Sequence, residues 1–362
     1  MISYVERKQY MENTKKLTGI QKALAIFGIA LGSVIALILV ILLSLHLFTP
    51  VVFHDFFSNA QEEYVTPGIY DGLVPQGYAY DGEHKVYIQC GYMADGKSAS
   101  RIYITDADNT KNSRYVELYT ADGKPYTGHT GGITVNQKFV WIANDGEGDD
   151  NCVWVLSLKE VLGAKNGDKI TLKTSFQPES RAAFCFVDTN YLWVGEFHDS
   201  EKYPTKDTHK FDVAGGKNSA LVCAYPLDSD SEYGIEKKED GDKVIFTPEK
   251  LLSITDNVQG FARSDKAGFV LSTSYAVSKS HLIFYKDLTS GDADATLEIN
   301  GTKVPVYFLD ADSKTDDVEM PPMSEEIFFK NDRVYVLFES ACMKYIFGNF
   351  TRGIHVYSYK YD

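Results

Sequence analysis

The stretch PQGYAYDGEHKVYIQCGY, residues 75–92, decides the fold because four similar stretches recur along the chain. In each, a Gly or another small residue precedes an apolar run, a short polar turn and a second apolar run, and this pattern predicts an antiparallel hairpin. The other copies are TGGITVNQKFVWIAND (130–145), RAAFCFVDTNYLWVGEF (181–197), VQGFARSDKAGFVLSTSY (258–275) and SEEIFFKNDRVYVLFES (324–340).

At least one further β-patterned run follows each hairpin, so the repeating unit is a meander of up to four strands. We assign to the five units, in order, RIYIT and YVELYT, VWVLSL and KITLKT, LVCAYPL and KVIFTP, HLIFYK and VPVYFL, and GIHVYSYKY. Because the fifth unit has only one further run, we expect residues near Glu63 to Thr66 to supply its outermost strand. Such repetition predicts an all-β fold, a five-bladed β-propeller over residues 63–362. Two stacked sandwiches would not explain the recurring hairpin.

An apolar segment precedes the repeats. From Ala23 to Phe48 the chain has 26 residues without Asp, Glu, Lys or Arg. Roughly 20 apolar residues suffice to cross a bilayer. The apolar region of a cleaved signal peptide is shorter, about 7–15 residues. All five basic side chains of residues 1–48 lie before the apolar segment, which favours a cytoplasmic N-terminus. We therefore expect a type II single-pass protein of the cell membrane, with residues 1–22 as cytoplasmic tail, 23–48 as transmembrane signal-anchor helix, and an extracellular C-terminal domain.

Residues 49–62 are expected to form a juxtamembrane linker. It contains three phenylalanines, Phe53, Phe56 and Phe57. These rings either dip into the membrane interface or pack against the folded domain, and the sequence leaves both readings open.

Charge and cysteine content narrow the class of protein. Outside residues 1–48 the chain has 31 basic and 48 acidic side chains, a net charge of −17, which excludes a nucleic-acid partner because such a surface repels phosphates. The five cysteines are widely spaced without a CxxC pair, so we interpret most of them as buried thiols and leave one disulfide open.

Polar residues mark one face of the predicted propeller. The first strand of each blade lines the axis and the second runs antiparallel to it, so the start of the first and the end of the second emerge together at one channel mouth. The strand starts are Gln76, His129, Thr130, Arg181, Gln259 and Glu325, and the strand ends are Gln89, Tyr92, Asn144, Asp145, Glu196, His198, Ser274, Tyr275 and Glu339.

This set suggests three kinds of role. A divalent cation such as Ca²⁺, which takes about 6–8 oxygen ligands, would be held by Asn144, Asp145, Glu196 and Glu325. A ligand would be bound by Gln76, Arg181, His198, Gln259 and Tyr275. The candidate catalytic bases are His129 and Glu339. The alternative is that a narrow channel needs polar groups and water for its own hydrogen bonds, without any ligand.

The pieces PQG (75–77), GHTGGI (128–133), VQGF (258–261), LSTSY (271–275) and VLFESACMKY (336–345) resemble those of a family of secreted or membrane-anchored bacterial β-propeller proteins without an established activity. The resemblance covers about residues 70–360; it implies the fold and supplies no catalytic residue. More distantly, the topology is similar to that of calcium-activated nucleotidases, and the Glu and Asn residues at the channel mouth are similar to the metal shell of gluconolactonase-type propellers. The motifs of neither group align residue by residue.

These observations predict a membrane-tethered, extracytoplasmic binding or scaffold propeller that need not be an enzyme. Its channel mouth and the long insertions of the third unit (198–219 and 229–242) would meet a small-molecule or protein partner. The alternative is a hydrolase of a phosphoester, lactone or sugar that depends on a Ca²⁺-like metal, with Arg181 holding the anionic part of the substrate. The GxSxG, HExxH, Walker and dinucleotide signatures are missing from the sequence, which argues against a standard serine or cysteine hydrolase.

Overall fold

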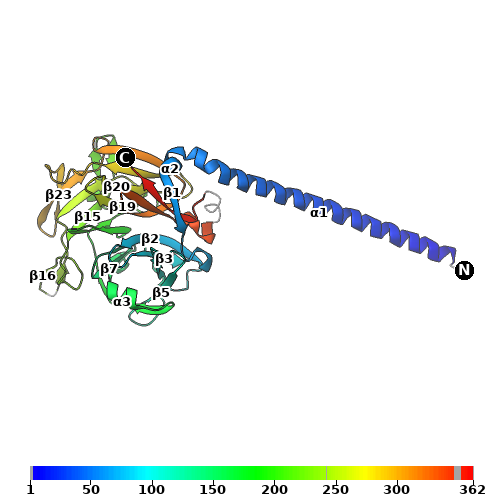
Figure 1. Ribbon diagram of the computed structural model, residues 1–362, viewed down its shortest axis with the longest axis horizontal. Coiled ribbons are helices and arrows are strands. Elements are labelled where there is room, and N and C mark those ends of the chain that lie inside the picture. The colour runs from blue at the N-terminus through cyan, green and yellow to red at the C-terminus, as the bar shows by residue number, and fades with distance from the viewer. Residues whose placement is uncertain (1–2, 242, 346–351, 362) are drawn as a thin grey trace. The chain divides into compact units, whose positions relative to one another are not determined.

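The computed structural model describes residues 3–241, 243–345 and 352–361, which form two compact units, residues 1–51 and 52–362 (Figure 1). The first unit consists of the helix α1 (Tyr4–Val52), in which Thr18–Val52 is long and apolar enough to cross a membrane. No other helix among the described residues meets that test. The predicted apolar helix is thus present.

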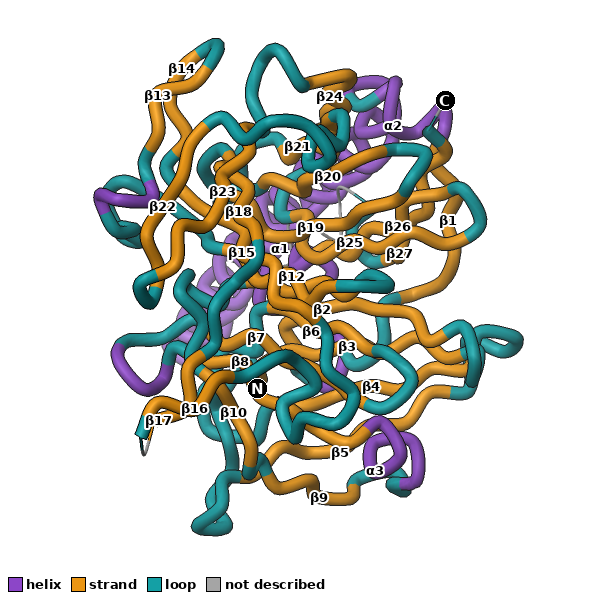
Figure 2. The backbone as a smooth tube through the Cα atoms, turned by 90° about the vertical axis from the view of Figure 1, so that its left-hand side faces the viewer, coloured by secondary structure: helices purple, strands orange, loops and turns teal. Residues whose placement is uncertain are grey.

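The second unit is a five-bladed β-propeller. Figure 2 shows the first strands of the blades near the middle of the domain and the last strands toward its rim. Blade 1 contains β2 (Leu73–Asp81), β3 (Val86–Met93), β4 (Arg101–Asp106), β5 (Ser113–Tyr119) and β9 (Asp168–Thr171), and blade 2 contains β6 (Gly132–Val135), β7 (Phe139–Asn144), β8 (Cys152–Ser157) and β10 (Thr174–Phe176). Blade 3 contains β11 (Phe184–Val187), β12 (Tyr191–Gly195), β15 (Ala220–Pro226), β18 (Lys250–Ile254), β23 (Thr302–Phe308) and β22 (Ala295–Ile299). Blade 4 contains β19 (Val258–Ser264), β20 (Gly268–Thr273), β21 (Ser280–Tyr285) and β24 (Lys314–Met320), and blade 5 contains β25 (Ser324–Lys330), β26 (Arg333–Phe338), β27 (His355–Lys360) and β1 (Ala60–Val65).

Short elements connect the blades. Two small hairpins lie outside them, β13 (Phe211–Val213) with β14 (Gly216–Asn218) and β16 (Lys238–Asp240) with β17 (Lys243–Ile245). The short helices are α2 (His54–Asn59), α3 (Leu158–Gly163) and the 3₁₀ turns η1 (Ile69–Asp71), η2 (Gly148–Asp150), η3 (Asp207–His209), η4 (Glu339–Ala341) and η5 (Met343–Tyr345).

The ring closes as the sequence predicted. The strand β1 runs antiparallel to β27, with Ala60 opposite Tyr359 and Val65 opposite His355, so the start of the domain supplies the outermost strand of blade 5. All five predicted hairpins are also present, as β2·β3, β6·β7, β11·β12, β19·β20 and β25·β26. Closure by two distant parts of the chain ties the ring together.

Three outer-strand assignments were wrong. The first half of KITLKT lies in β9, which pairs parallel to β5 of blade 1, and only its last residue, Thr174, belongs to a strand of blade 2, β10. KVIFTP contributes β17 of a separate hairpin, and the strand that follows β15 in blade 3 is β18. VPVYFL lies in β23, which pairs parallel to β18 of blade 3, while blade 4 ends with β24. The prediction assumed a local antiparallel meander, and a sequence pattern carries no signal for parallel pairing with a distant strand.

Crowding at the axis explains the small residues of the repeat. A Cβ atom on Gly77 would lie 2.4 Å from the backbone nitrogen of Ile133, and one on Gly260 would lie 2.7 Å from the backbone oxygen of Glu325. Blade 5 instead has Glu326 at this place, and its buried Oε2 accepts a hydrogen bond from the Ile133 N–H at 3.2 Å. The inner strands therefore approach one another closely around one carboxyl group.

The phenylalanines near residue 55 pack on the propeller. Phe56 of α2 is fully buried and stacks on Tyr359, with ring centroids 5.8 Å apart and an interplanar angle of 5°. Phe57 packs edge-on against Tyr357. Of the two readings that the sequence left open, the structure shows packing against the folded domain.

The cysteines are buried thiols, as predicted. All five are unpaired, and each side chain is nearly or fully inaccessible to solvent. Burial raises the pKa of Cys152 to about 12, which keeps this thiol protonated at neutral pH.

Adding one methyl group at the axis is expected to destabilise the ring. Gly77→Ala places a Cβ against backbone atoms of blade 2, and overpacking of this kind costs about 1–3 kcal/mol. Chemical denaturation should show that loss, whereas Gly163→Ala, where a Cβ would meet nothing within 4 Å, should leave stability unchanged or slightly higher. Equal stability of the two variants would contradict the crowding argument.

Candidate ligand-binding site at the channel mouth

A pocket of 580 Å³ opens at one end of the propeller axis, and all five blades line it. Small-molecule sites usually enclose about 300–1,000 Å³. Nine of the lining residues are among those that the sequence analysis placed at this face, namely Gln76, Tyr92, His129, Asp145, Arg181, Gln259, Ser274, Tyr275 and Glu339. Six others were not singled out, namely Ala183, Phe197, Tyr203, Ala276, Lys344 and Tyr345.

The centre of one wall is Glu339, the first residue of η4. Its Oε1 accepts hydrogen bonds from the Gln76 side-chain amide at 3.0 Å and from the Tyr92 hydroxyl at 3.3 Å. Burial raises the pKa of Glu339 to about 7, although the Lys344 ammonium and these two donors oppose the rise. This carboxyl group therefore carries its proton for part of the time at neutral pH.

Lys344 lies beside this group. Its Nζ donates to the Tyr92 hydroxyl at 2.8 Å and stands over the rings of Tyr92 and Tyr345, at 4.8 and 5.1 Å from their centroids. Cation–π contacts of this kind hold an ammonium without neutralising it. Sequence reasoning missed Lys344 because it lies after the end of the hairpin, in η5.

Glu325 lies deeper and is almost fully buried. Its Oε1 accepts a hydrogen bond from the Gln259 side-chain amide at 3.3 Å. Burial raises the pKa of Glu325 well above its usual range, and the nearby carboxyl groups of Glu339 and Glu326 raise it further. Ionising this side chain is therefore unfavourable without a cation beside it, and a metal ligand has to be ionised.

Between blades 2 and 3, Arg181 pairs with Asp145, whose Oδ1 accepts from the guanidinium Nε at 2.6 Å. Burial raises the pKa of Asp145 and the guanidinium lowers it, with a net rise. The pair therefore places an arginine in the pocket wall with part of its charge compensated.

His129 lies at the rim, where its ring stacks on Tyr92 with centroids 5.1 Å apart. Loss of hydration lowers its pKa to about 4, and the Lys344 ammonium contributes. His129 is nevertheless exposed to solvent, so hydration of the ring reduces this lowering of its pKa. Either way the imidazole is neutral at pH 7 and could accept a hydrogen bond or a proton.

Three of the non-glycine residues with a left-handed backbone conformation lie at this face. Thr130, Asn257 and Ala276 have positive φ angles of 51°, 60° and 50°. A left-handed conformation is unfavourable for a β-branched residue such as Thr130, whose N–H donates to Asn144 Oδ1 at 3.4 Å.

Four predicted site residues do not line this pocket. Asn144 also donates through Nδ2 to the Asp150 carbonyl at 2.7 Å, and His198 Nδ1 lies 2.9 Å from Asp256 Oδ1. The other two are Glu325, described above, and Glu196, whose carboxylate accepts from the backbone N–H groups of Arg181 and Leu221 at 3.1 and 3.0 Å. Within residues 3–241, 243–345 and 352–361, no group of three or more His, Cys, Asp or Glu side chains is placed to hold a metal ion. The calcium site stays a prediction without geometric support.

Glu196 instead belongs to a buried ionic cluster that the sequence did not reveal. His209 of η3 is fully buried and its Nδ1 lies 3.0 Å from both oxygens of Glu196, while Nε2 lies 3.4 Å from Glu179. Burial by itself lowers the pKa of His209, but the contacts with Glu179 and Glu196 outweigh it and the net shift is upward. The contacts of the His209 imidazole with two carboxyl groups thus anchor the insertion at 198–219 to blade 3.

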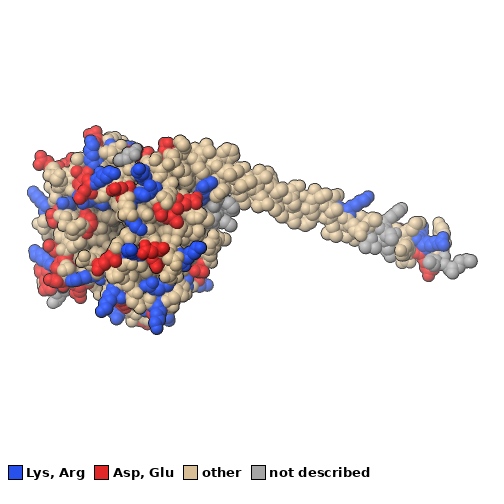
Figure 3. All heavy atoms as spheres, in the orientation of Figure 1, with Lys and Arg blue, Asp and Glu red and all other residues tan. Residues whose placement is uncertain are grey.

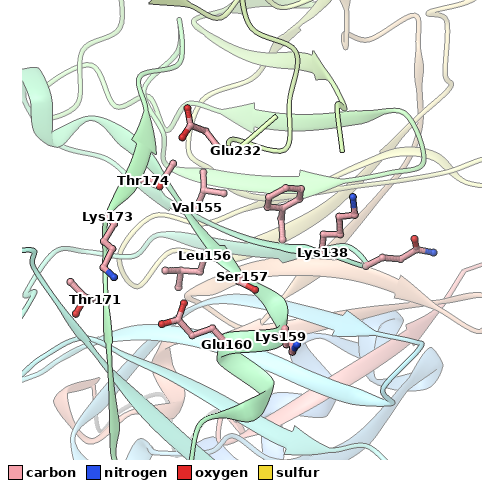
Figure 4. A pocket seen from close by; sticks show the side chains of 12 residues that line it. Lys138, Val155, Leu156, Ser157, Lys159, Glu160, Thr171, Lys173, Thr174 and Glu232 are labelled. Atoms are coloured by element: carbon pink, nitrogen blue, oxygen red, sulfur yellow. The ribbon is translucent and has the colours of Figure 1, made fainter. Parts of the chain in front are cut away.

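A second hollow, of 480 Å³, lies at the outer edge of blades 1 and 2. Figure 4 shows its side chains, which include three lysines and two glutamates, Lys138, Lys159, Lys173, Glu160 and Glu232. Glu339 and His129, whose pKa values burial shifts, line the channel-mouth pocket. Such groups in a concave pocket mark the better candidate site.

The cationic His209 predicts a specific pH dependence of stability. Because the folded-state pKa is raised above the ordinary value of about 6.5, its contribution is complete below that pH and is lost as pH rises through the folded-state pKa. Unfolding by urea at several pH values should show this loss in the wild type and not in His209→Gln, which should be less stable at pH 6 by on the order of 3 kcal/mol. The exposed His54→Gln should behave like the wild type, and a His209 variant with an unaltered pH profile would refute the ionic cluster.

Comparison with known proteins assigns this chain to no family. No family model and no curated protein matches this chain. Among solved structures, it is similar to the PQQ-bound aldose sugar dehydrogenase of Streptomyces coelicolor, with 13% identity, a TM-score of 0.41 and coverage of 77% of this chain and 76% of the other. It is also similar to BamB of Moraxella catarrhalis (9% identity, TM-score 0.32, coverage 79% and 85%) and to an exo-β-1,3-galactanase of Phanerochaete chrysosporium (11%, 0.44, coverage 83% and 64%). The chain therefore resembles structures of varied function, and that likeness assigns it none of their activities.

Proposed function

We propose that this chain is a membrane-tethered, extracytoplasmic propeller that binds a small polar ligand in the channel-mouth pocket. One observation carries the proposal: polar and aromatic side chains from all five blades converge on one pocket that contains a buried carboxyl group with a pKa of about 7. A structural role alone does not require that convergence, because the blades already close through their own strands.

The tether is supported by α1. Its segment Thr18–Val52 meets the length and composition of a membrane span, and all five basic residues of the first 48 precede the uncharged stretch. Positive charge on the N-terminal flank favours a cytoplasmic N-terminus, which places the propeller outside.

A second candidate function is hydrolysis, and the pKa of Glu339 is the observation that favours it, because a general acid or base works best near its operating pH. The metal-dependent form of this hypothesis needs Ca²⁺ on Asn144, Asp145, Glu196 and Glu325. Asn144 and Glu196 already accept hydrogen bonds from backbone N–H groups, and Asp145 is paired with Arg181. Burial also raises the pKa of Glu325 well above its usual range. Binding without catalysis is therefore the function that we favour.

Topology can be tested in cells of a bacterial expression host. The full chain should remain in the membrane fraction after alkaline carbonate extraction, and protease added to spheroplasts should digest the propeller but leave the N-terminal tail. A chain that lacks residues 1–48 should be recovered in the soluble fraction. Protection of the propeller in intact spheroplasts would contradict the proposed orientation.

Ligand binding can be tested on the full chain in detergent micelles by thermal unfolding against a library of small polar compounds. A ligand at 100 times its Kd stabilises the native state by about 2.7 kcal/mol, so at least one compound should raise the midpoint. Tyr275→Ala should abolish that rise, whereas Tyr70→Ala, which removes an exposed tyrosine outside the pocket, should retain it. A library without any stabilising compound would count against the proposal.

The same assay separates the second candidate. Millimolar Ca²⁺ and EDTA should leave the midpoint unchanged if the pocket holds no metal. A rise with Ca²⁺ that disappears in Glu325→Gln, a substitution that resembles the neutral acid and should preserve the fold, would instead support the metal-dependent hydrolase.

A further inference from the structure

The pocket differs in charge from the domain around it. Outside residues 1–48 the chain has a net charge of −17, and Figure 3 shows acidic and basic side chains interspersed over the visible face. The pocket is lined by equal numbers of each, Asp145 and Glu339 against Arg181 and Lys344. Locally, the acidic excess of the domain is absent.

The two cations retain binding capacity. The guanidinium of Arg181 donates a hydrogen bond to Asp145 through Nε alone. Its two terminal nitrogens donate to no acceptor among the described residues. Lys344 contacts the Tyr92 hydroxyl and two aromatic rings, and within the described chain it forms no ion pair with a carboxylate. Guanidinium and ammonium groups in this state are suited to a ligand carboxylate.

The carboxyl group of Glu339, whose pKa burial raises and the Lys344 ammonium lowers, is only partly ionised at neutral pH. Around Glu339 lie Gln76 and Tyr92 of blade 1, Lys344 of η5, and the buried acid Glu325 of β25. Because burial raises the pKa of Glu339 to about 7, the pocket gains net positive charge as pH falls to neutrality and below.

The floor offers acceptors for hydroxyl groups. Gln76 and Gln259 each use the side-chain nitrogen on a carboxyl oxygen, of Glu339 and Glu325 respectively. Their amide oxygens accept no hydrogen bond from the residues described, and the neutral ring of His129 adds another possible acceptor. Fixed acceptors on several sides fit a ligand with several hydroxyl groups.

An aromatic wall completes the pocket. The ring of Phe197 packs edge-on against the ring of Tyr203, with centroids 5.2 Å apart. The ring centroid of Tyr275 lies 6.3 Å from that of Phe197. Aromatic faces with polar tips suit a ring that has both C–H faces and hydroxyl edges.

From the two cations, the partly ionised Glu339, the acceptors and the aromatic wall, and resting on the proposed function, we infer that the ligand is an acidic carbohydrate, a sugar ring that carries a carboxylate. The carboxylate lies against Lys344 and the free edge of Arg181, the ring packs on the Phe197–Tyr275 wall, and its hydroxyl groups donate to Gln76 and Gln259. The nearest helical elements, η4 and η5, have three residues each and so offer no N-terminal phosphate site.

Isothermal titration of the full chain in micelles with glucuronate, galacturonate and the matching neutral sugars, glucose and galactose, tests this inference. At least one uronate should bind roughly tenfold or more tightly than its neutral counterpart, as expected for charge-assisted hydrogen bonds. Lys344→Gln should remove the difference and Lys344→Arg should retain it. Lys159→Gln, at the outer hollow, should match the wild type.

The outcomes separate the two proposals. If neutral sugars bind as tightly as uronates, or if no sugar binds while another compound of the library does, the acidic-carbohydrate inference is overturned and the ligand-binding function stands. If no small molecule binds at all, both fail. A further check is pH, because uronate affinity should rise as pH falls through 7 in the wild type and should vary much less in Glu339→Gln, which cannot titrate.

Discussion

Five inner strands must share one axis, and the rest of the structure depends on that crowding. Gly77 and Gly260 admit the neighbouring backbones, and the single long side chain at this level, Glu326, occupies the centre. The residues immediately before these three are Gln76, Gln259 and Glu325. In all three strands the pairing register shifts here, so Gln76, Gln259 and Glu325 lie in β-bulges, which redirect side chains next to a site.

Burial then determines the chemistry of the acidic groups. Carboxyl groups near the axis lose hydration, and the pKa values of Glu325, Glu326 and Glu339 all rise. Glu325, which the sequence analysis assigned to a cation site, is thus harder to ionise than an exposed carboxyl group. The positive charge of Arg181 and Lys344 gains importance for the same reason, since less negative charge opposes it.

Parts of the chain far from the hairpins finish the site. Tyr203 belongs to the insertion at 198–219, which His209 anchors through Glu179 and Glu196. Lys344 follows the last hairpin and reaches back to Tyr92 of blade 1. Tyr203 of the aromatic wall and the exposed cation Lys344 are therefore additions to a ring whose own repeats provide the floor and the other wall residues, Phe197 and Tyr275.

The sequence by itself determined the five hairpins, the strand that closes the ring, the apolar helix and nine of the pocket residues, because each depends on local periodicity and on the fixed geometry of antiparallel pairs. Only the tertiary structure decided the partners of β9 and β23, the burial that raises the pKa of Glu339, the structural use of Glu196, and the positions of Lys344, Phe197 and Tyr203. These depend on contacts between residues far apart in the chain, for which alternation along a strand carries no information.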